Sequence, residues 1–518
     1  MLLQKIGQGN ELLRQQRAGE AVALGNELAR TYPTHARAFA FAAEACRVAG
    51  NLPAALDWID GAIRCDDDPQ YKIKKAWLLS RLRRRNEIPA LAAELSQHAD
   101  GDALLLWQLG KLYYHHNLLP DAIEHYGRAL AIAGDHPGWL YDRAVAQFYS
   151  GAAGPAEEDL NKVLSMSPQA GSVIYLRSTL RRQRPETNHV QDIEARLKAG
   201  FAKVEDEACA LYALAKELED LGEYEKSFSA LLAGARLKRS TLQYDASSFY
   251  ETLQEISRVQ DAEAMAASAA GHDEEGAIFI VGMPRTGTTL AERILLQSGK
   301  VKDAGELTDF GFLLSEAVGK VQAREPGLSS VQAAMRMDFA DMGREYMRGA
   351  RQLAGDNSLF IDKMPANYMY CGLIHKALPK AKIIHLVRDP LDSCYAVFKT
   401  MFFNAYDFSY DLEELADYYI AYRRMMQHWH EVMPGMILDV RYEDLVTDTE
   451  TQARRIYEWC GLEWTPDALR VPDKQAVFAT ASAAQVREPV HTRSINSSRR
   501  HAEHLVPLKE KLEAAGIL

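Results

Sequence analysis

The residues from Ile278 to Leu295 constrain the fold of this chain more than any other stretch. Ile278 to Val281 is a short apolar run rich in β-branched residues, which is typical of a buried parallel strand. Gly282 to Thr289 is a turn with two glycines and a proline, and apolar residues at helical spacing follow it. A strand, a glycine-containing turn and a helix together offer backbone N–H groups and a helix N-terminus to a phosphate. This stretch therefore predicts a phosphate-binding loop in an α/β domain.

The turn has the spacing of a Walker A loop but not its lysine. The two glycines and Thr289 are spaced as in that loop, whereas Thr288 stands where the loop has lysine. The turn also contains a proline followed by Arg285. On the helix that follows, the apolar residues share one face, so Glu292 and Arg293 are expected to face elsewhere.

The chain has 518 residues, which is too long for one ordinary domain and predicts two or three. Its content of 47% hydrophobic and 25% charged residues is typical of a globular protein that buries a core in each half. A formal net charge of −11 argues against a general nucleic-acid binder, although it allows a local basic pocket for an anion.

Six cysteines lie scattered along the sequence, with no CxxC pair and no Cys/His cluster at metal-ligand spacing. They are expected to be reduced thiols, and no metal site is predicted. The N-terminal residues turn polar too early for a signal peptide, and no apolar run approaches the roughly 20 residues that span a bilayer. A cytoplasmic location is therefore the expectation.

Residues 1–240 are rich in Ala, Leu, Glu and Arg and contain a repeat of about 34 residues. Each unit contains an alanine shortly after residues that are typical of a turn. These alanines are the second residues of the pairs Glu20-Ala21, Ala54-Ala55, Pro89-Ala90, Asp121-Ala122 and Pro155-Ala156. A diverged unit follows around 208–238, and residues 177–188 break the pattern as a longer connection. The layout resembles the tetratricopeptide repeat, in which antiparallel helix pairs stack into a solenoid.

Such a solenoid usually binds a peptide or protein, and a helical spacer or a dimerisation arm is the alternative. Homo-oligomerisation stays open. The aromatic residues Trp107, Tyr113, Tyr114 and Tyr126 recur at helical spacing, which favours a place in the core over ligand contact. Residues 257–276 become small and polar, and we place the domain boundary at 271–276. The predicted domains are a helical repeat domain over residues 1–270 and a second domain over residues 277–518.

Beyond Ala277 the pattern changes to alternating strands and helices. Strands are predicted at 278–281, 359–363, 383–387 and 436–440, with helices between them, the longest at about 412–433. This alternation predicts a doubly wound α/β sheet, which binds ligands at the C-terminal ends of its strands. The turn at 282–289, Lys363, Arg388 and Tyr442 each follow a predicted strand, so we expect them to converge at one edge of the sheet.

These motifs resemble those of sulfotransferases that use 3′-phosphoadenylyl sulfate (PAPS). Pro284–Thr289 looks like their 5′-phosphosulfate loop, and Leu386–Ser393 looks like their 3′-phosphate motif. Segments similar to the tyrosylprotein sulfotransferase branch are Gly305-Glu306, Asp362-Lys363-x-Pro365, Arg441–Leu445 and Ser482–Val490. The resemblance covers residues 277–518. Together with the repeats it implies a bacterial-type fusion of an α-helical tetratricopeptide solenoid with a P-loop-like α/β domain that has a central parallel sheet.

The resemblance implies that PAPS is the co-substrate and that no metal takes part. The residues that would hold its 5′-phosphate are Pro284, Arg285, Thr286, Gly287, Thr288 and Thr289. Arg285 would add a charge-assisted fork close to the transferred group, which makes it a candidate catalytic residue. Arg388 would bind the 3′-phosphate, with a salt bridge to Asp389 or Asp392 as the alternative. Tyr442 and Arg487 complete the expected donor site.

The resemblance also assigns the chemistry. Glu306 would be the general base that removes the acceptor proton, and Lys363 would stabilise the bridging oxygen of the donor. Ser482 would assist at the same oxygen. The alternative roles are a carboxylate before a helix for Glu306, a surface lysine at a strand end for Lys363 and a loop hydroxyl for Ser482.

One position departs from the family pattern. The family usually has a serine eight residues after the arginine as a second ligand of the 3′-phosphate, and here that position is Ala396. Ser393 lies nearby in the sequence and is the candidate substitute. A neutral hydrogen bond is worth about 0.5–1.5 kcal/mol, so its loss would weaken donor binding without abolishing it.

The acceptor is not identified by the sequence. The branch resemblance suggests a protein tyrosine presented by the repeats, and a carbohydrate or small-molecule hydroxyl is the alternative. A nucleotide-dependent kinase or hydrolase is a further alternative, against which Thr288 and the lack of a Walker B acid argue. In a last alternative, a non-catalytic scaffold, the repeats alone would be functional.

Overall fold

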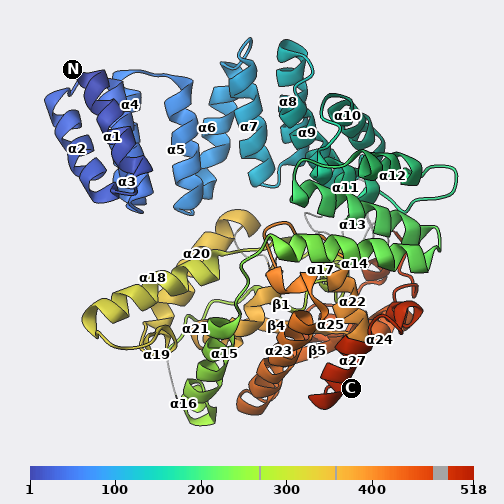
Figure 1. Ribbon diagram of the computed structural model, residues 1–518. Helices are drawn as coiled ribbons and strands as arrows, with labels where there is room; N and C mark the ends of the chain where they lie inside the picture. The colour runs from blue at the N-terminus through green and yellow to red at the C-terminus, as the bar shows by residue number, and fades with distance from the viewer. Residues whose placement is uncertain (268–269, 356–358, 471–487) are drawn as a thin grey trace. The chain divides into compact units, whose positions relative to one another are not determined.

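The computed structural model describes residues 1–267, 270–355, 359–470 and 488–518 (Figure 1). The chain forms two compact units, residues 1–146 and residues 147–518. The second unit therefore contains the last part of the helical region together with the sheet. The predicted division at residues 270 and 277 marks a change of architecture, and the compact units divide the chain at a different place, inside the helical region.

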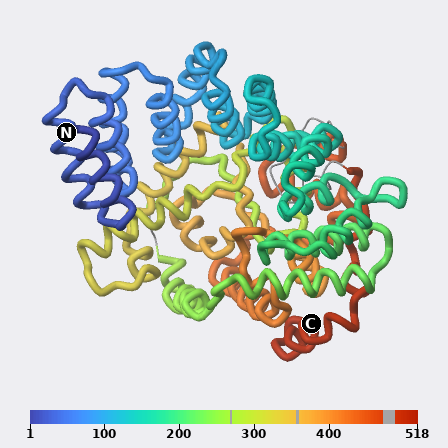
Figure 2. The backbone as a smooth tube through the Cα atoms, turned by 45° about the horizontal axis from the view of Figure 1, so that its top comes forward, coloured from blue at the N-terminus to red at the C-terminus, as the bar shows by residue number. Residues whose placement is uncertain are grey.

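Residues 1–146 are built from helices that follow one another in antiparallel pairs, as the tube in Figure 2 shows. The helices are α1 (Leu2–Arg14), α2 (Ala18–Thr31), α3 (Ala36–Val48), α4 (Leu52–Cys65), α5 (Pro69–Arg81), α6 (Ile88–Gln97), α7 (Ala103–His115), α8 (Leu119–Ala133) and α9 (Pro137–Tyr149), with the short 3-10 helix η1 (Arg85–Glu87) before α6. The alanines Ala21, Ala55 and Ala122 lie in the first turns of α2, α4 and α8 and are fully buried. Their small side chains allow the paired helices to approach closely, which confirms the predicted repeat fold.

The helical region continues through the start of the second unit. Its helices are α10 (Ala153–Met166), α11 (Gly171–Thr179), α12 (Val190–Ala199), α13 (Val204–Asp220), α14 (Tyr224–Ser240), α15 (Ser247–Val259) and α16 (Ala262–Ala266). The connection predicted at 177–188 lies between α11 and α12, and the diverged unit predicted at 208–238 is the pair α13 and α14.

A five-stranded parallel sheet organises the rest of the chain. Its strands are β1 (Ala277–Gly282), β2 (Val301–Asp303), β3 (Leu359–Asp362), β4 (Lys382–Val387) and β5 (Ile437–Arg441). They lie in the order β2-β3-β1-β4-β5, and in the central strand Phe279 is in register with Asp362 on one side and Ile383 on the other. All four predicted strands are present. The three-residue strand β2 is an addition, because so short a segment carries no recognisable alternation.

Helices cover both faces of this sheet, which confirms the predicted doubly wound α/β domain. On one face, Ile278 and Ile280 of β1 pack with residues of α17 (Thr288–Leu296) and α25 (Thr449–Trp459). On the other, Phe279 contacts Phe310 of α18 (Asp309–Arg324) and stacks on Tyr346 of α20 (Phe339–Ala354). The remaining elements are α19 (Ser330–Ala334), α21 (Cys371–Ala377), α22 (Pro390–Phe398), α23 (Leu412–Val432), α24 (Tyr442–Thr447), α27 (Val506–Ala514) and the 3-10 helices η2 (Pro365–Tyr370), η3 (Asp407–Tyr410), η4 (Pro466–Leu469) and η5 (Ser497–His501).

The helices of the second unit pack directly against the sheet domain. Tyr212 of α13 donates a hydrogen bond to the carbonyl oxygen of Phe398 at 3.1 Å, and Phe228 of α14 stacks on the Phe398 ring. Arg239 of α14 forms a two-pronged ion pair with Glu414 of α23, with both N–O distances 2.7 Å. This packing explains why residues 147–276 belong to the same compact unit as the sheet.

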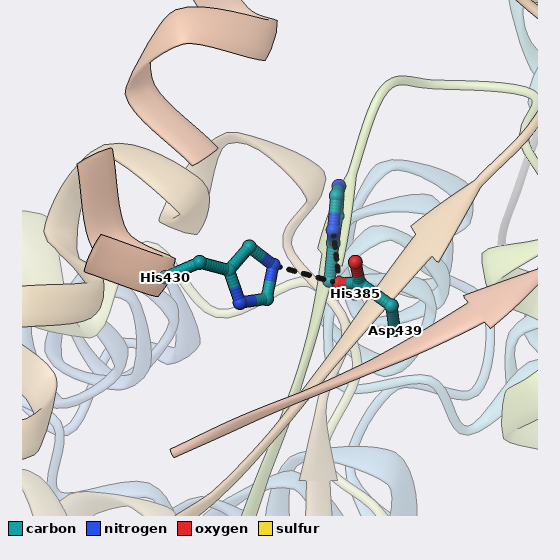
Figure 3. Close-up of side chains that lie close together, drawn as sticks. All are labelled: His385, His430 and Asp439. Atoms are coloured by element: carbon teal, nitrogen blue, oxygen red, sulfur yellow. Dashed lines mark hydrogen bonds and ion pairs between the residues drawn. The ribbon is translucent and has the colours of Figure 1, made fainter. Parts of the chain in front are cut away.

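A polar cluster joins two strands to a helix on the α23 side of the sheet (Figure 3). Asp439 of β5 accepts hydrogen bonds from Nδ1 of His385 in β4 at 2.8 Å and from Nε2 of His430 in α23 at 3.0 Å. His385 and Asp439 are direct neighbours in the sheet register, and the second ring nitrogen of His385 pairs with the Tyr422 hydroxyl. The cluster fastens the C-terminal end of α23 to the sheet.

None of the helices in the described ranges combines the length and the apolar character that crossing a membrane would require.

Candidate functional site

The C-terminal ends of all five strands carry the candidate functional residues. The loop 283–287 follows β1, Glu306 follows β2, and Lys363 follows β3 directly. Arg388 follows β4, and Tyr442 follows β5. Because parallel strands end at a common edge, the sheet brings these residues to one side of the domain, as the sequence predicts.

The loop after β1 folds back tightly on its neighbours. Arg285 and Gly287 both have left-handed backbone conformations, with φ of 67° and 101°. A Cβ atom at Gly287 would lie 2.7 Å from the ring of Tyr442, so a larger residue would force the loop away from β5. The Thr286 hydroxyl donates to the carbonyl oxygen of Met283 at 2.7 Å and closes the turn. Helix α17 then begins at Thr288, and its N-terminus is at the loop.

A cavity of about 100 Å³ opens beside this loop. Its walls include five of the predicted donor-site residues, which are Arg285, Gly287, Thr289, Arg388 and Tyr442. Pro284, Thr286 and Thr288 are buried and lie in the loop without lining the cavity. Its wall also includes polar residues for which the sequence predicted no role in the donor site, among them Arg293, Lys399 and Ser497.

Arg388 is held by backbone carbonyls rather than by a carboxylate. Its Nη1 donates to the carbonyl oxygen of Arg285 at 2.9 Å, and its Nη2 donates to that of Ser494 at 2.6 Å. Its guanidinium lies 4.8 Å from the centre of the Tyr442 ring. Within the described ranges, its buried Nε has no hydrogen-bond partner. A buried cation with an unused donor fits an anionic ligand.

The two aspartates after Arg388 have other partners. Asp389 caps α22 by accepting from the backbone N–H of Asp392 at 2.9 Å. Asp392 in turn accepts from the backbone N–H groups of Asn496 and Ser498, at 2.6 and 2.8 Å. Among the residues that the structure describes, neither carboxylate is ion-paired with Arg388. The structure therefore does not show the salt bridge that was the alternative role of Arg388.

Ser393 and Ala396 have different surroundings. The Ser393 hydroxyl is fully buried and donates to the carbonyl oxygen of Arg388, just before the helix that contains Ser393, at 3.3 Å. Ala396, the position where the family pattern has serine, lies in the wall of the cavity. The proposal that Ser393 replaces the missing serine therefore receives no support from the position of its hydroxyl.

Glu306 and Lys363 form an ion pair with a distance of 2.8 Å between Oε1 and Nζ. The Lys363 side chain is only 4% exposed, whereas that of Glu306 is 42% exposed. Burial lowers the pKa of Lys363, but the surrounding acidic groups, together with the hydrogen bond to Glu306, outweigh it and hold the pKa above its usual value. Lys363 is therefore an ammonium ion inside the domain, and it is not the surface lysine of the alternative interpretation.

The backbone around Glu306 is fixed to the end of β3. The N–H of Lys363 donates to the carbonyl oxygen of Gly305 at 3.0 Å. The N–H of Leu307 donates to Oδ1 of Asp362 at 3.3 Å, and the N–H of Gly305 donates to Oδ1 of Asp303 at 2.6 Å. These bonds place the Glu306 carboxylate next to the lysine.

The structure corrects the expected orientation of two side chains on α17. Glu292 and Arg293 are buried, although the apolar pattern of the helix indicates that they face elsewhere. Glu292 reaches toward Lys363, with 3.9 Å between Oε2 and Nζ, and Arg293 donates from Nη1 to the carbonyl oxygen of Glu488 at 3.1 Å. Charged residues are rarely buried without partners, so apolar periodicity alone could not identify them.

Two predicted site residues, Ser482 and Arg487, lie outside the described residues. The segment that follows them contributes residues 488–491 to the wall of the cavity.

Residues 385, 430 and 439 offer two imidazole nitrogens and a carboxylate oxygen within 4.8 Å of one another, which is a set that could hold a metal ion. Their mutual hydrogen bonds already satisfy these atoms. None of the three residues lines the cavity beside the loop.

Comparison with known proteins agrees with this geometry. Residues 277–466 match the Sulfotransferase family. The matched region begins at β1 and includes all five strands and the candidate residues from Pro284 to Tyr442.

Among curated proteins, an uncharacterized protein of Aquifex aeolicus is 27% identical over 391 residues, covering 73% of this chain and 50% of its own length. The nodulation protein NoeE of Sinorhizobium fredii is 34% identical over 122 residues, covering 22% of this chain and 28% of its own. The omega-hydroxy-beta-dihydromenaquinone-9 sulfotransferase Stf3 of Mycobacterium bovis is 30% identical over 109 residues, covering 19% and 28%. The chain thus spans half or less of the length of these relatives.

Among solved structures, the C-terminal part of a TPR repeat-containing protein from Cytophaga hutchinsonii has a TM-score of 0.36 at 15% identity, covering 45% of this chain and 95% of its own. The sulfotransferase domain of the Synechococcus olefin synthase has a TM-score of 0.29 at 18% identity, covering 45% and 97%.

Proposed function

We propose that this chain is a PAPS-dependent sulfotransferase that transfers a sulfuryl group to an acceptor hydroxyl. The observation that carries the proposal is the meeting of two features at one sheet edge within a region that matches the Sulfotransferase family. One feature is the Arg285–Arg388 cavity beside the loop after β1. The other is the Lys363–Glu306 pair.

In this proposal the loop after β1 binds the 5′-phosphate of the donor. The backbone N–H groups at the start of α17 and the hydroxyls of Thr288 and Thr289 supply hydrogen bonds, and Arg285 supplies charge. Arg388 binds the 3′-phosphate and uses the Nε donor that has no partner in the described structure. The guanidinium of Arg388 lies over the ring of Tyr442, which supports it.

The transfer is an in-line displacement at sulfur. Glu306 accepts the proton of the acceptor hydroxyl, and the acceptor oxygen forms a bond to sulfur. The bond between sulfur and the bridging oxygen breaks, and adenosine 3′,5′-bisphosphate leaves with the electron pair. Lys363 stabilises the negative charge that grows on the bridging oxygen. When Glu306 takes up the proton, its ion pair with Lys363 weakens and the ammonium is released toward the leaving group.

Incubation with sulfur-labelled PAPS and fractionated cell extract tests the function and looks for the acceptor at the same time. Labelled sulfate appears in an acceptor fraction with the wild-type protein and not with Lys363→Ala.

A binding titration distinguishes the proposed function from the kinase or hydrolase alternative. Tight binding of adenosine 3′,5′-bisphosphate without Mg²⁺ supports the proposal, and Mg²⁺-dependent binding of ATP contradicts it.

For the acceptor, we favour a phenolic hydroxyl such as that of a protein tyrosine. Tyr149 and Tyr406 lie close enough to the proposed base for its charge to act on them: burial, with the charge of Glu306 as a second cause, raises the pKa of both tyrosines. Aromatic side chains near the base fit a flat acceptor. The relative Stf3 is described as acting on an omega-hydroxy-beta-dihydromenaquinone, so a small-molecule hydroxyl is the second candidate.

We further propose that the repeats of residues 1–146 bind an acidic peptide. A groove of about 260 Å³ is lined by apolar residues that include Ala40, Ile59 and Trp77 and by the cations Lys74 and Arg81. Its one acidic lining residue, Glu44, is ion-paired with Arg47, which also lines it. Lys74 and Arg81 are exposed, and no ion pair is recorded for either in the part of the chain that the structure describes. An apolar side chain next to a carboxylate on the peptide would match this combination.

A further inference from the structure

Glu292 belongs to a cluster of three acidic groups around one lysine. Its side chain is 3% exposed and approaches Lys363 Nζ to 3.9 Å from the side of α17. The Glu292 carboxyl group also interacts with that of Asp303, the last residue of β2. Asp303 in turn accepts the N–H of Gly305, which directly precedes Glu306. A chain of contacts therefore runs from α17 through β2 to the proposed base.

Two carboxyl groups that interact can form a hydrogen bond only when one of them carries a proton, because an ionised carboxylate can only accept. Full ionisation of Glu292, Asp303 and Glu306 would also leave two uncompensated negative charges beside Lys363. Burying such an excess is costly. Glu292 is the more deeply buried partner, and burial raises its pKa well above the usual value, with Asp303 adding to the rise and Lys363 opposing it.

We propose that Glu292 is a positioning residue that remains protonated and donates to Asp303, so that Asp303 holds the Gly305–Glu306 backbone in place. This inference rests on the proposed function, because it assigns Glu292 to the site of that reaction. A neutral Glu292 leaves Glu306 as the charged partner of Lys363. The base and the lysine can then separate more easily when Glu306 takes up the acceptor proton, since Glu292 adds no negative charge that would retain the ammonium.

Two substitutions distinguish the donor role from a need for charge. Glu292→Gln keeps a neutral donor of nearly the same shape, whereas Glu292→Ala removes the donor. We expect Glu292→Ala to lower kcat at least tenfold and Glu292→Gln to restore most of that loss. Equal damage in both variants, or wild-type kcat in Glu292→Ala, would overturn the inference.

The pH profile supplies a readout that a structural role would not change. Raising the pH ionises Glu292 in the wild type and adds a charge that retains Lys363, so kcat falls on the alkaline side. Asp303, Glu306 and Lys363 are the other charged groups that face Glu292, and all three are present in both proteins. Glu292→Gln lacks this alkaline fall, and an identical fall in both proteins would contradict the inference.

Infrared difference spectroscopy tests the protonation state without any turnover. The spectrum of the wild type minus Glu292→Gln at neutral pH should contain the C=O stretch of a protonated carboxylic acid, shifted in D₂O. Its absence would refute the protonated state even if the enzyme is active. Its presence in a protein that transfers no sulfate from PAPS would leave the inference standing and contradict the proposed function instead.

Discussion

Arg388 donates a hydrogen bond to the carbonyl oxygen of Arg285 over 2.9 Å, and this bond connects the end of β4 to the loop after β1. It fixes the Arg388 guanidinium to the backbone of Arg285, and both arginines line the cavity of the proposed donor site. Burial lowers the pKa of Arg285, and the nearby charge of Arg388 lowers it further. Two cations held together inside the protein repel each other, and an anion with two phosphate groups relieves that repulsion.

The first prediction concerns the two proposed catalytic side chains. Glu306→Gln removes the base, and Lys363→Ala removes the charge that stabilises the leaving oxygen. Each should lower kcat at least roughly 100-fold, on the scale of general-base and electrostatic effects. Steady-state kinetics with labelled PAPS measures this. Lys302→Ala, which changes an exposed lysine of β2, is the control and should retain the wild-type rate. Wild-type kcat in both site variants would refute the assignment.

Arg388→Ala should act mainly on donor binding. The loss of a charge-assisted hydrogen bond of about 1.5–3 kcal/mol corresponds to weaker binding by about 10- to 150-fold. Calorimetric titration with adenosine 3′,5′-bisphosphate gives the affinity directly. The matched control is Arg424→Ala, because Arg424 is an exposed arginine on α23. If both variants bind as the wild type does, Arg388 does not contact the 3′-phosphate.

Ala396→Ser should strengthen donor binding. Ala396 lies in the cavity wall, so a hydroxyl at this position can reach a ligand there. A gain of about 0.5–1.5 kcal/mol corresponds to about two- to tenfold tighter binding. Ser393→Ala is the comparison, since the Ser393 hydroxyl is occupied by the Arg388 carbonyl, and it should leave the affinity within about twofold. The opposite ranking of the two variants would show that Ser393 is the phosphate ligand.

The His385–Asp439–His430 cluster predicts a pH-dependent ion pair. Burial raises the pKa of Asp439, but the hydrogen bonds from the two histidines outweigh it and hold the pKa well below its usual range. The hydrogen bond to Asp439 raises the pKa of His430, against burial and the charge of Arg423. His385 differs, because burial lowers its pKa.

The directions of these pKa shifts determine how the contribution of each group to stability depends on pH. The contribution of Asp439 is present above its unfolded pKa of about 4 and is lost as the pH falls through its folded value. The contribution of His430 is complete below its unfolded pKa of about 6.5 and is lost as the pH rises through its raised folded value. The pair is therefore strongest between about pH 4 and 6.5. It contributes about 1 kcal/mol or less, because both side chains are partly exposed.

An NMR titration of the His430 ring measures this pair. In Asp439→Asn the pKa of His430 should fall toward the value of an ordinary histidine, and His430→Gln identifies the resonance. An unchanged pKa in Asp439→Asn would mean that the hydrogen bond does not persist in solution.

The groove in residues 1–146 predicts a binding defect that is independent of catalysis. The double substitution Lys74→Glu and Arg81→Glu reverses the charge of both lining cations. Because the new carboxylates repel an acidic peptide, binding of such a peptide with an apolar residue should weaken at least tenfold. Fluorescence anisotropy with labelled peptides measures the affinity. Arg30→Glu with Arg64→Glu makes the same charge change at exposed positions outside the groove and should have little effect. Equal losses in both double variants would indicate a general charge effect rather than a docking site.

The sequence predicted the strands well because buried parallel strands are continuous apolar runs, as in Ile278–Val281 and Ile383–Val387. It also placed Lys363 and Arg388 correctly, because a residue after such a strand can only lie at the C-terminal edge. It missed β2, whose three residues include Lys302 and Asp303 and show no pattern.

The charged residues under the site were less predictable. Apolar spacing treats Glu292 as a surface residue, yet it lies inside because Lys363 and Asp303 meet it there. The burial of Asp362 could not be predicted from apolar spacing either. Asp362 is fully buried because it accepts hydrogen bonds from Leu307 and Tyr346, which lie far away in the sequence. Such pairings are tertiary and leave no periodic signal in a single sequence.

The contacts of Tyr212 and Phe228 with Phe398 bear on how this protein can be dissected. A fragment that begins at Ala277 would keep every strand, but it would expose the apolar surface around Phe398 that α13 and α14 cover. It would also lose the anchor that Arg239 provides for α23. The smallest piece that retains an intact sheet domain therefore starts upstream, at the first helices of the second unit. An insertion or a domain swap at residue 277 would interrupt a single cooperative structure. The family match, which begins at residue 277, would by itself suggest a domain boundary there.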